Sequence, residues 1–309
     1  MQSIRRVQKE ILLLDSGDLL FKRYRKPIAD EEVEALTAQA GLIIECFNLM
    51  GCDALGVGDD ELSLGKGVLF RLSHQATFPF ISSNLINAST GKTLFAPSLI
   101  KEHGGLKIGI FSLLSSAFFD GSSDPKLNGL IVQSPFETAE QMVRQLRKKT
   151  DVIVLLSHLG LAKDVELAQT ISGIDVIIGG HSGVNIGTPN LVNNTIILQT
   201  AANGLSGARI DLQPTRKRFG FHDVTTNESL KERHPRINGR LNAEETSPPK
   251  SQQREQTRET ISQTLARMPQ QLEFTTYFTP LTDDIGTHAE IDRLLDIYRR
   301  KHPHRISGD

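Results

Sequence analysis

Short polar clusters in this sequence carry side chains of the kinds that bind divalent metal ions. The clusters are Gly17-Asp18, Gly58-Asp59-Asp60-Glu61, Ser157-His158-Leu159-Gly160 and Gly179-Gly180-His181-Ser182-Gly183. Each cluster follows a short apolar run that is typical of a strand. Carboxylates and imidazoles together suit a divalent transition metal, and the neighbouring glycines allow the backbone to approach closely. The sequence therefore predicts a metal site, provided that the fold brings the clusters together.

Any one of these clusters is weak evidence by itself. A Gly-Asp pair after a strand is typical of a turn or a helix cap, and His158 alone could be a hydrogen-bonded core histidine. The repeated order of strand and then polar cluster favours chemistry, because the carboxyl ends of parallel strands meet at one edge of an α/β sheet. We expect metal ligands at that edge, drawn from the carboxylates and imidazoles of these clusters.

Alternating strand and helix patterns position these clusters up to about residue 212. The expected strands span residues 11–14, 54–57, 78–82, 108–113, 152–156, 176–178, 195–199 and 208–212. The expected helices span residues 31–50, 135–149 and 163–171, with Gly51 after the first and the capping box Ser134-Pro135-Phe136-Glu137 opening the second. Residues 152–178 have the β-α-β pattern of a parallel sheet. The order predicts an α/β fold.

The composition changes after residue 212. Residues 216–270 are rich in Arg, Glu, Gln, Ser and Pro and have few large apolar side chains, which is typical of a polar linker. A second capping box, Thr287-His288-Ala289-Glu290, precedes a short amphipathic helix with a basic end. We therefore expect an α/β domain over residues 1–213, followed by a polar linker and helical C-terminal extension over residues 214–309.

Charge and hydropathy exclude several classes of partner. The 35 basic and 36 acidic residues nearly cancel, so no global field favours nucleic acid or an anionic membrane. Apolar runs such as 152–156 are far shorter than the roughly 20 residues of a membrane span. No signal peptide is visible in the chain as given, so a cytoplasmic location is expected, or a periplasmic one if an upstream signal segment was lost. The sequence indicates no oligomeric state.

Seven segments in order resemble the bacterial 5′-nucleotidase and 2′,3′-cyclic phosphodiesterase branch of the calcineurin-like metallophosphoesterases. They are LLLDSGD, MGCDALGVGDDELSLG, FPFISSN, GGLKIGIFSL, DVIVLLSHLG, DVIIGGHSG and NNTIILQTAANGLSGARIDL, and they cover about residues 8–212. The resemblance implies two packed mixed β-sheets flanked by helices. It places Asp18 at the position of the bridging ligand and Asp59 at that of an asparagine ligand. His158 and His181 take the positions of the second-metal histidines, and Asn84 matches a segment near the substrate.

Three departures from the family pattern fall on one half of the site. Asp60 stands where the family has its catalytic histidine, and Gly183 stands where it has a first-metal histidine. The early Asp-x-His motif has no counterpart in this chain. We therefore expect one divalent transition metal ion, zinc, manganese or iron, in place of two. Asp60 and Asn84 are the expected catalytic residues, with Asp60 near the leaving group.

Two functional hypotheses remain open on the sequence. The first is a metal-dependent hydrolase of small phosphoesters, either a 5′-nucleotidase-like phosphomonoesterase or a cyclic phosphodiesterase. The alternative is a degenerate, weakly active or inactive relative that keeps one metal site for binding or partner interaction. Asp60 and Gly183 favour the alternative, whereas the intact set of two aspartates and two histidines favours the hydrolase, which we take first. Nothing after residue 213 resembles the base-binding domain of nucleotidases, so a nucleotide substrate is not supported.

Overall fold

A computed structural model describes residues 5, 10–22, 28–212, 221–223, 272–282 and 285–303. Contacts along the chain divide it into two compact units, Met1–Ser206 with Pro280–Asp309, and Gly207–Thr279. The predicted polar linker, residues 216–270, lies outside the described residues except for 221–223. All four expected metal ligands lie in the first unit, so its strands and helices are the ones that build the site.

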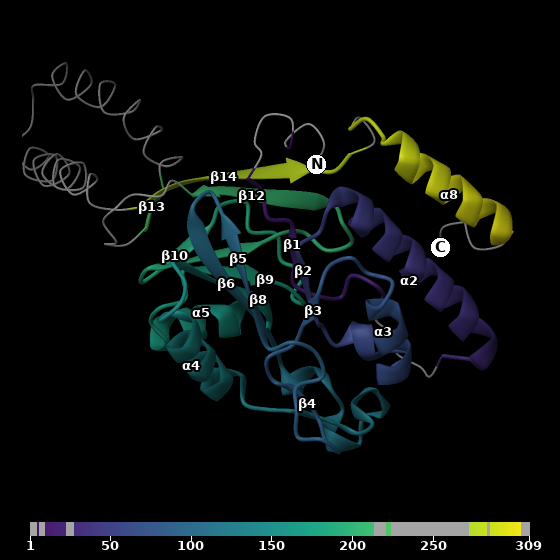
Figure 1. The fold of residues 1–309 in the computed structure, drawn as a ribbon, viewed down its shortest axis with the longest axis horizontal. Coiled ribbons are helices and arrows are strands. Elements are labelled where there is room, and N and C mark those ends of the chain that lie inside the picture. Colours follow the sequence, from purple (N-terminus) through teal and green to yellow (C-terminus); the bar gives the residue numbers. More distant parts are fainter. Residues whose placement is uncertain are drawn as a thin grey trace, which may run out of the picture. The chain divides into compact units, whose positions relative to one another are not determined.

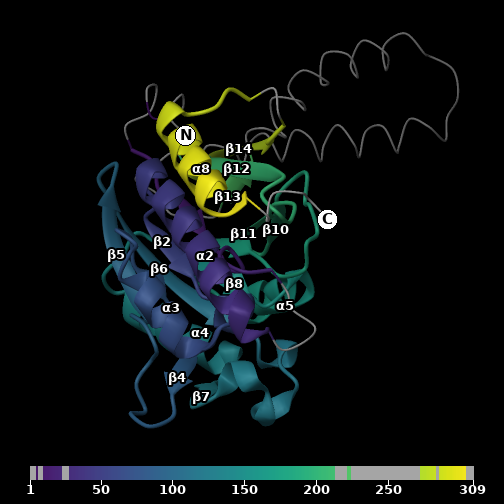
Figure 2. The same ribbon diagram turned by 90° about the vertical axis from the view of Figure 1, so that its right-hand side faces the viewer.

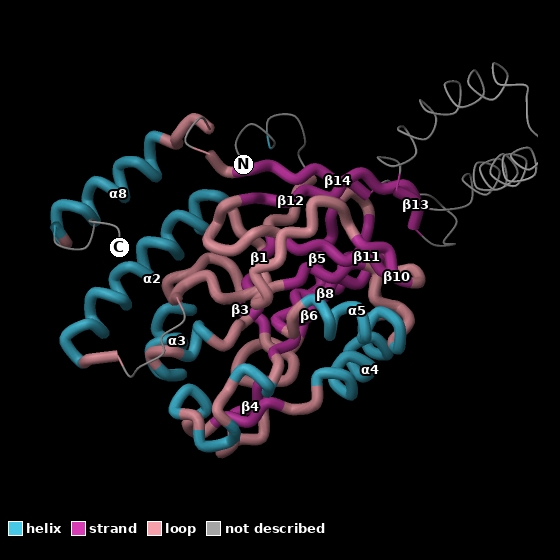
Figure 3. Tube along the Cα trace, turned by 180° about the vertical axis from the view of Figure 1, so that it is seen from behind, coloured by secondary structure: helices cyan, strands magenta, loops and turns pink. Residues whose placement is uncertain are grey.

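A six-stranded mixed sheet forms the larger layer of the first unit (Figures 1 and 3). The strand order is β10-β11-β9-β8-β6-β5, with bounds Ser98–His103 (β5), Leu106–Leu114 (β6), Val152–His158 (β8), Val176–Gly179 (β9), Asn190–Val192 (β10) and Thr195–Gln199 (β11). The four central strands run parallel, and β5 and β10 are antiparallel edge strands. The β6 to β8 register pairs Ile108 with Val152 and Leu114 with His158. The β-α-β unit predicted over residues 152–178 is confirmed.

A smaller parallel sheet forms the second layer and contacts the first. Its strands are β1 (Leu14–Asp15), β2 (Ala54–Gly56) and β3 (Phe80–Ile81), in that order. A further antiparallel pair joins β4 (Leu85–Asn87) to β7 (Leu130–Val132). Strand β2 packs on β6 and β8. Gly56 lies so close to Ser112 that a Cβ at this position would be 2.7 Å from the serine Oγ. Only glycine allows the two sheets to approach this closely.

Helices cover both sheets on their outer sides, which gives each sheet its own apolar core (Figure 2). Helices α2 (Asp30–Met50) and α3 (Gly65–Ser73) pack with β2 and β3, and helices α4 (Pro135–Leu146) and α5 (Leu161–Thr170) pack on the six-stranded sheet. As predicted, α2 ends at Gly51, which has φ 72°, and the Ser134 hydroxyl caps α4 by accepting the Glu137 N–H. The predicted α/β fold class, with packed sheets flanked by helices, is confirmed; the larger sheet is mixed as expected, and the smaller one is entirely parallel.

One helix, Glu31–Met50, has the length and mean hydropathy of a membrane span. Three of its side chains, Leu36, Ala40 and Ile44, lie four residues apart and are buried in the core over the small sheet. Four glutamates lie along the same helix, and they would be costly in lipid. The packing is that of an amphipathic core helix.

The C-terminal helix α8 (Ala289–Lys301) lies beside α2 in the first unit (Figure 2). It was predicted from its capping box, but its N-cap is His288 and not Thr287. The His288 side chain accepts the N–H of Glu290 at 3.3 Å. Arg299, Arg300 and Lys301 close the last turn, where positive charge favours the helix dipole.

The second unit contains a three-stranded sheet of order β12-β14-β13, with bounds Ser206–Leu212 (β12), Phe221–Asp223 (β13) and Leu272–Pro280 (β14). Strand β12 was predicted as residues 208–212. Strand β14 was not predicted, and it shows that the C-terminal extension contributes a strand as well as a helix. The domain boundary near residue 213 stays a prediction.

Candidate metal centre

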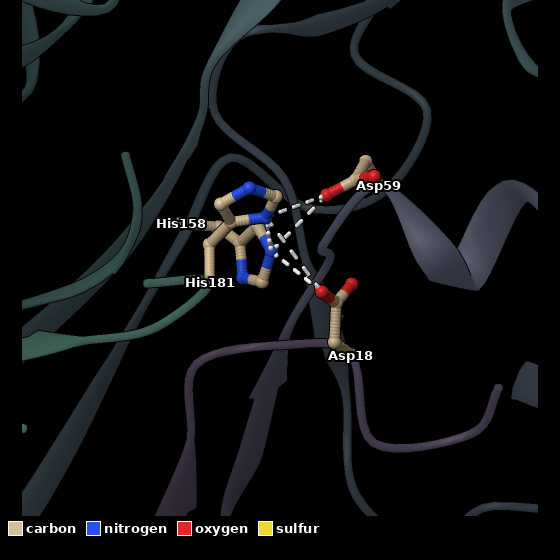
Figure 4. Close-up of side chains that lie close together, drawn as sticks. All are labelled: Asp18, Asp59, His158 and His181. Atoms are coloured by element: carbon tan, nitrogen blue, oxygen red, sulfur yellow. Dashed lines mark hydrogen bonds and ion pairs between the residues drawn. The ribbon is translucent and has the colours of Figure 1, made fainter. Parts of the chain in front are cut away.

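The four expected ligands stand at the carboxyl ends of four parallel strands. His158 is the last residue of β8, and His181 comes two residues after β9 ends at Gly179. Asp59 and Asp18 each come three residues after the ends of β2 and β1. Figure 4 shows their side chains pointing toward one another from separate segments. The structure thus brings together side chains that are up to 163 residues apart in the sequence (181 − 18).

The separations between donor atoms fit a single metal ion. His158 Nε2 lies 3.0 Å from Asp18 Oδ2, 3.3 Å from Asp59 Oδ1 and 3.2 Å from His181 Nδ1. His181 Nδ1 lies 3.1 Å from Asp59 Oδ1 and 3.9 Å from Asp18 Oδ2. All four ligand atoms are within 4.8 Å of one another. Ligands about 2.0–2.2 Å from a tetrahedral ion are about 3.3–3.6 Å apart, so this donor set can hold one divalent transition metal.

His158 is oriented by a hydrogen bond on the far side of its ring. The fully buried ring places Nδ1 3.0 Å from the Ser16 carbonyl oxygen, so Nδ1 carries the proton and Nε2 faces the other ligands. Burial would lower the pKa of His158, but hydrogen bonds to Asp18 and Asp59 raise it to about 10. The centre therefore attracts positive charge strongly, in the form of a proton or of a metal ion.

Asp59 titrates in the opposite sense. Burial would raise the pKa of Asp59, but hydrogen bonds from His158 and His181 and the nearby charge of Lys126 hold it far below its ordinary value. Asp59 is therefore a carboxylate at every pH at which the protein works, which is the form that binds a cation.

Two of the four ligands have a left-handed backbone. Asp18 has φ 59° and His181 has φ 65°, and the other non-glycine residues with positive φ in the described part of the chain are Asn193 and Asn203, which lie in turns. Asparagine adopts this conformation readily, whereas aspartate and histidine do so less often. Backbone strain of this kind concentrates at functional sites, where neighbouring contacts maintain it. Its presence at two candidate ligands supports a functional role for them.

Glu61 maintains the conformation of the Asp18 loop. Its buried carboxylate accepts the N–H groups of Asp18 (2.7 Å), Leu19 (2.7 Å), Leu20 (3.1 Å) and Gly58 (2.8 Å). The two loops also touch, since a Cβ on Gly58 would lie 2.4 Å from Asp18 Oδ1. Glu61 was visible in the Gly58-Asp59-Asp60-Glu61 cluster, but sequence reasoning gave it no role. The structure makes it the residue that positions Asp18.

The ring of Phe118 covers the two histidines. It stacks on His181 with ring centroids 3.3 Å apart and an interplanar angle of 10°, and it meets His158 edge-on at 6.0 Å. Phe118 belongs to a short 3₁₀ turn, Ser116–Phe118, that follows β6. An apolar ring on the imidazoles limits their rotation and excludes water from one side of them. No sequence pattern pointed to this residue.

Asp60 lies at the centre but is not one of the four converging ligands. Its N–H donates to Asp18 Oδ1 at 2.9 Å, and its carboxylate pairs with Lys126 Nζ at 2.6 Å. Burial raises the pKa of Asp60, and the hydrogen bond from Lys126 opposes that rise. The same ammonium is 3.3 Å from Asp59 Oδ2. Lys126 was missed by sequence reasoning.

Asn84 is buried and hydrogen-bonded to main-chain atoms. Its Nδ2 donates to the carbonyl oxygens of Leu114 (2.8 Å) and Gln133 (2.9 Å), and its Oδ1 accepts the Leu114 N–H at 2.9 Å. This arrangement ties β4, β6 and the segment before α4 together. It is a positioning arrangement, and the expected catalytic role of Asn84 stays a prediction.

Comparison with known proteins finds relatives that are named as nucleotidases and phosphoesterases. No family model matches this chain. The 5′-nucleotidase of Vibrio cholerae is 29% identical over 198 residues, which are 59% of this chain and 34% of that protein. The trifunctional nucleotide phosphoesterase YfkN of Bacillus subtilis is 28% identical over 258 residues, 69% of this chain and 17% of that protein. The mouse 5′-nucleotidase is 30% identical over 201 residues, 62% of this chain and 32% of that protein. The chain spans about a third or less of these relatives.

Solved structures share the fold. The 5′-nucleotidase precursor of Thermus thermophilus has a TM-score of 0.68 at 18% identity, covering 99% of this chain and 52% of its own. The calcineurin-like phosphoesterase YfkN of Bacillus subtilis has a TM-score of 0.66 at 17% identity, covering 97% of this chain and 86% of its own. Relatives and solved structures together confirm that the chain resembles the bacterial 5′-nucleotidase branch of the calcineurin-like metallophosphoesterases.

Proposed function

We propose that this chain is a metal-dependent phosphoester hydrolase that binds one divalent transition metal ion through Asp18, Asp59, His158 and His181. The observation that carries the proposal is the convergence of these four donor atoms at the strand ends. The names of the relatives, 5′-nucleotidase and nucleotide phosphoesterase, support a small phosphoester as the substrate. The activity is then a 5′-nucleotidase-like phosphomonoesterase or a cyclic phosphodiesterase.

The side-chain chemistry supports zinc, manganese or iron as the ion, because two imidazoles and two carboxylates suit all three. One ion is proposed in place of two because Gly183 offers no ligand at the position of the family's first-metal histidine. Within the described part of the chain, the group around His158 is the one cluster of three or more metal-binding side chains.

The chemistry that a divalent ion supplies when bound is polarisation of a phosphoryl oxygen and a lower pKa for an attacking water. The chain's own residues prepare the centre for that chemistry. Ser16 orients His158, Glu61 holds Asp18 in its left-handed conformation, and Phe118 shields the imidazoles. Asp60 is proposed to lie on the leaving-group side, where its contact with Lys126 keeps it in place.

The degenerate alternative is not favoured. The matched relatives carry hydrolase names, and the four-donor set is geometrically complete. Asp60 and Gly183, which favoured the alternative on the sequence, are compatible with a hydrolase that works with one ion.

Metal analysis and hydrolysis assays on matched histidine variants test the proposal. Purified protein should contain about one transition metal ion per chain and hydrolyse p-nitrophenyl phosphate or its bis-ester with added zinc, manganese or iron. His181→Ala removes a ligand that is only half-buried, so the variant should fold, lose more than about 100-fold in metal affinity and lose the activity. His103→Ala is the matched control, because His103 also pairs with a carboxylate, Glu10 at 2.9 Å, but outside the centre.

The control should keep both metal and activity. Wild-type protein without stoichiometric metal, or a His181→Ala variant that hydrolyses both esters as fast as wild type, would overturn the proposal.

A further inference from the structure

A lysine from a distant segment lies at the candidate metal centre. Lys126 Nζ is 2.6 Å from Asp60 Oδ1 and 3.3 Å from Asp59 Oδ2. The lysine side chain is 18% exposed, whereas the two carboxylates are almost fully buried. Lys126 is therefore the more solvent-accessible partner in both of these ion pairs.

The turn that carries Lys126 is fixed by its own contacts. Residues Pro125–Leu127 form a single 3₁₀ turn whose N-cap is Asp124. The Asp124 carboxylate accepts the N–H groups of Lys126 and Asp120, both at 2.9 Å. Leu127 is buried in the core beneath. A capped turn with a buried anchor holds the ammonium in one place, which a lysine on an open loop would not achieve.

The charge of Lys126 changes the net charge that a phosphate would meet at the centre. The three aspartates at the centre carry −3 and one divalent ion carries +2, so this set sums to −1 before a phosphate arrives. The Glu61 carboxylate adds further negative charge, which its four backbone N–H donors partly offset. A phosphoryl group is itself an anion, and it would be repelled at these short distances. The ammonium of Lys126 brings the sum to zero (−3 + 2 + 1).

We infer that Lys126 is the substrate-facing cation of this centre, and that its ammonium binds a non-bridging phosphoryl oxygen and supplies the positive charge that a second metal ion supplies in a two-metal site. The inference rests on the proposed function. An ammonium has three N–H donors, and the described residues that it contacts, Asp59 and Asp60, occupy two of them. The third is available to a phosphoryl oxygen.

Burial would lower the pKa of Lys126, but the hydrogen bond to Asp60 and the charge of Asp59 raise it.

A second lysine provides a matched control. Lys101 Nζ lies 2.7 Å from Asp53 Oδ1, in another half-buried lysine–aspartate pair of the same unit. Asp53 precedes β2, so this pair is at the amino ends of the strands, opposite the metal centre. Lys101→Met removes the same kind of pair as Lys126→Met, without touching the centre.

Isothermal titration of the metal-loaded protein with inorganic phosphate, and of the metal-free protein with Mn²⁺, tests the inference. Lys126→Met should weaken phosphate binding about 10- to 100-fold, the usual effect of losing a charged hydrogen bond. The same variant should bind Mn²⁺ as tightly as wild type or more tightly, because a cation near Asp59 is gone. Lys126→Arg should lose less phosphate affinity than Lys126→Met, and Lys101→Met should lose none.

A merely structural lysine would give a different pattern, in which Lys126→Met weakens Mn²⁺ and phosphate binding together. That pattern, or unchanged phosphate binding, would overturn the inference and leave the proposed function standing. Wild-type protein that takes up no metal would remove both. If Lys126→Met does not fold, the double variant Lys126→Met/Asp60→Asn replaces it, because it removes both charges of the pair. The phosphate affinity of the double variant should be about tenfold or more below that of the single variant Asp60→Asn.

Discussion

Replacing Glu61 by glutamine tests how the fold prepares the centre for a metal. Glutamine has nearly the same shape as glutamate, but one of its two acceptor oxygens becomes an NH₂ donor. The Glu61 carboxylate accepts two N–H groups on each oxygen, from Leu19 and Leu20 on one and from Asp18 and Gly58 on the other. Whichever way the amide turns, two backbone donors lose their acceptor.

The size of the effect follows from those two lost bonds. A backbone N–H left without a partner in a buried position costs about 1–3 kcal/mol, so the two lost bonds in Glu61→Gln should lower the free energy of unfolding by about 2–6 kcal/mol. In either orientation of the amide, the Asp18 loop loses at least one of its hydrogen bonds to residue 61. Asp18 then has less support for its φ of 59°, and the metal affinity should fall about 10- to 100-fold.

Urea unfolding and metal titration measure both effects. They belong at pH 8, because burial and the charge of Asp18 raise the pKa of Glu61 to about 7, and the wild-type side chain is a carboxylate above that pH. Glu166→Gln is the control, since Glu166 is half exposed and pairs with Lys163 on the surface of α5, where a loss of less than about 1 kcal/mol is expected. A Glu61→Gln variant with wild-type stability and metal affinity would refute the reasoning. Lower stability with unchanged metal affinity would refute the link between Glu61 and Asp18.

Two further variants test the surroundings of the histidines. Burial raises the pKa of Asp164 to about 7 from an ordinary 3.8, although the Ser157 hydroxyl donates to it, so the folded chain favours the protonated acid. That stabilisation is present below about pH 4 and is lost as the pH rises to 7. In urea unfolding from pH 4 to 8, the free energy of unfolding of wild type should therefore fall by at most about 4 kcal/mol relative to that of Asp164→Asn. Parallel pH profiles of the two proteins would contradict this. Phe118→Leu removes the ring stacked on His181, and metal titration should show binding about 2- to 10-fold weaker. Phe70→Leu, which changes an exposed ring, should leave metal binding unchanged. Equal effects of the two variants would contradict the stacking role.

Much of the fold and the convergence of the ligands could be predicted from the sequence, because both follow from local patterns. Apolar runs of strand length set β8, β9 and β11, and Gly51 set the end of α2. The rule that parallel strands present their carboxyl ends at one edge predicted that the clusters would converge. In the structure Asp18 and Asp59 follow strands of the smaller sheet, whereas His158 and His181 follow strands of the larger one, so the site lies between two sheets.

The remaining elements depend on contacts that the sequence does not display. Helix α3 begins Gly65-Lys66-Gly67, where helix propensity is poor, and it forms because Val68, Leu69 and Leu72 are buried. Strand β14 lies beyond a long polar stretch, and the composition of that stretch hid a strand that pairs with β12.

The polar environment of the centre was also beyond sequence reasoning. Lys126 is a single lysine in a loop rich in Gly, Ser and Asp, and no spacing connects it to Asp60, which lies 66 residues earlier. Asn84 was interpreted as a substrate residue because of its neighbours in the sequence. Its three side-chain bonds to main-chain atoms appear only when β4 and β6 are placed side by side.

The residues that depart from the pattern of the resembled family can be explained together by how the charges at the centre are compensated. Asp59, Asp60 and Glu61 are consecutive acids that are all buried, which is costly for a fold unless cations or hydrogen-bond donors compensate for them. Glu61 has four backbone donors, Asp60 has Lys126, and Asp59 shares the two histidines and Lys126. Gly183 contributes no ligand where the resembled family has a histidine for another ion, and Lys126 adds a positive charge beside Asp59 and Asp60. The proposed divalent ion and the Lys126 ammonium together carry +3, which offsets the charge of the three aspartates. This balance is why we expect the centre to bind a phosphate.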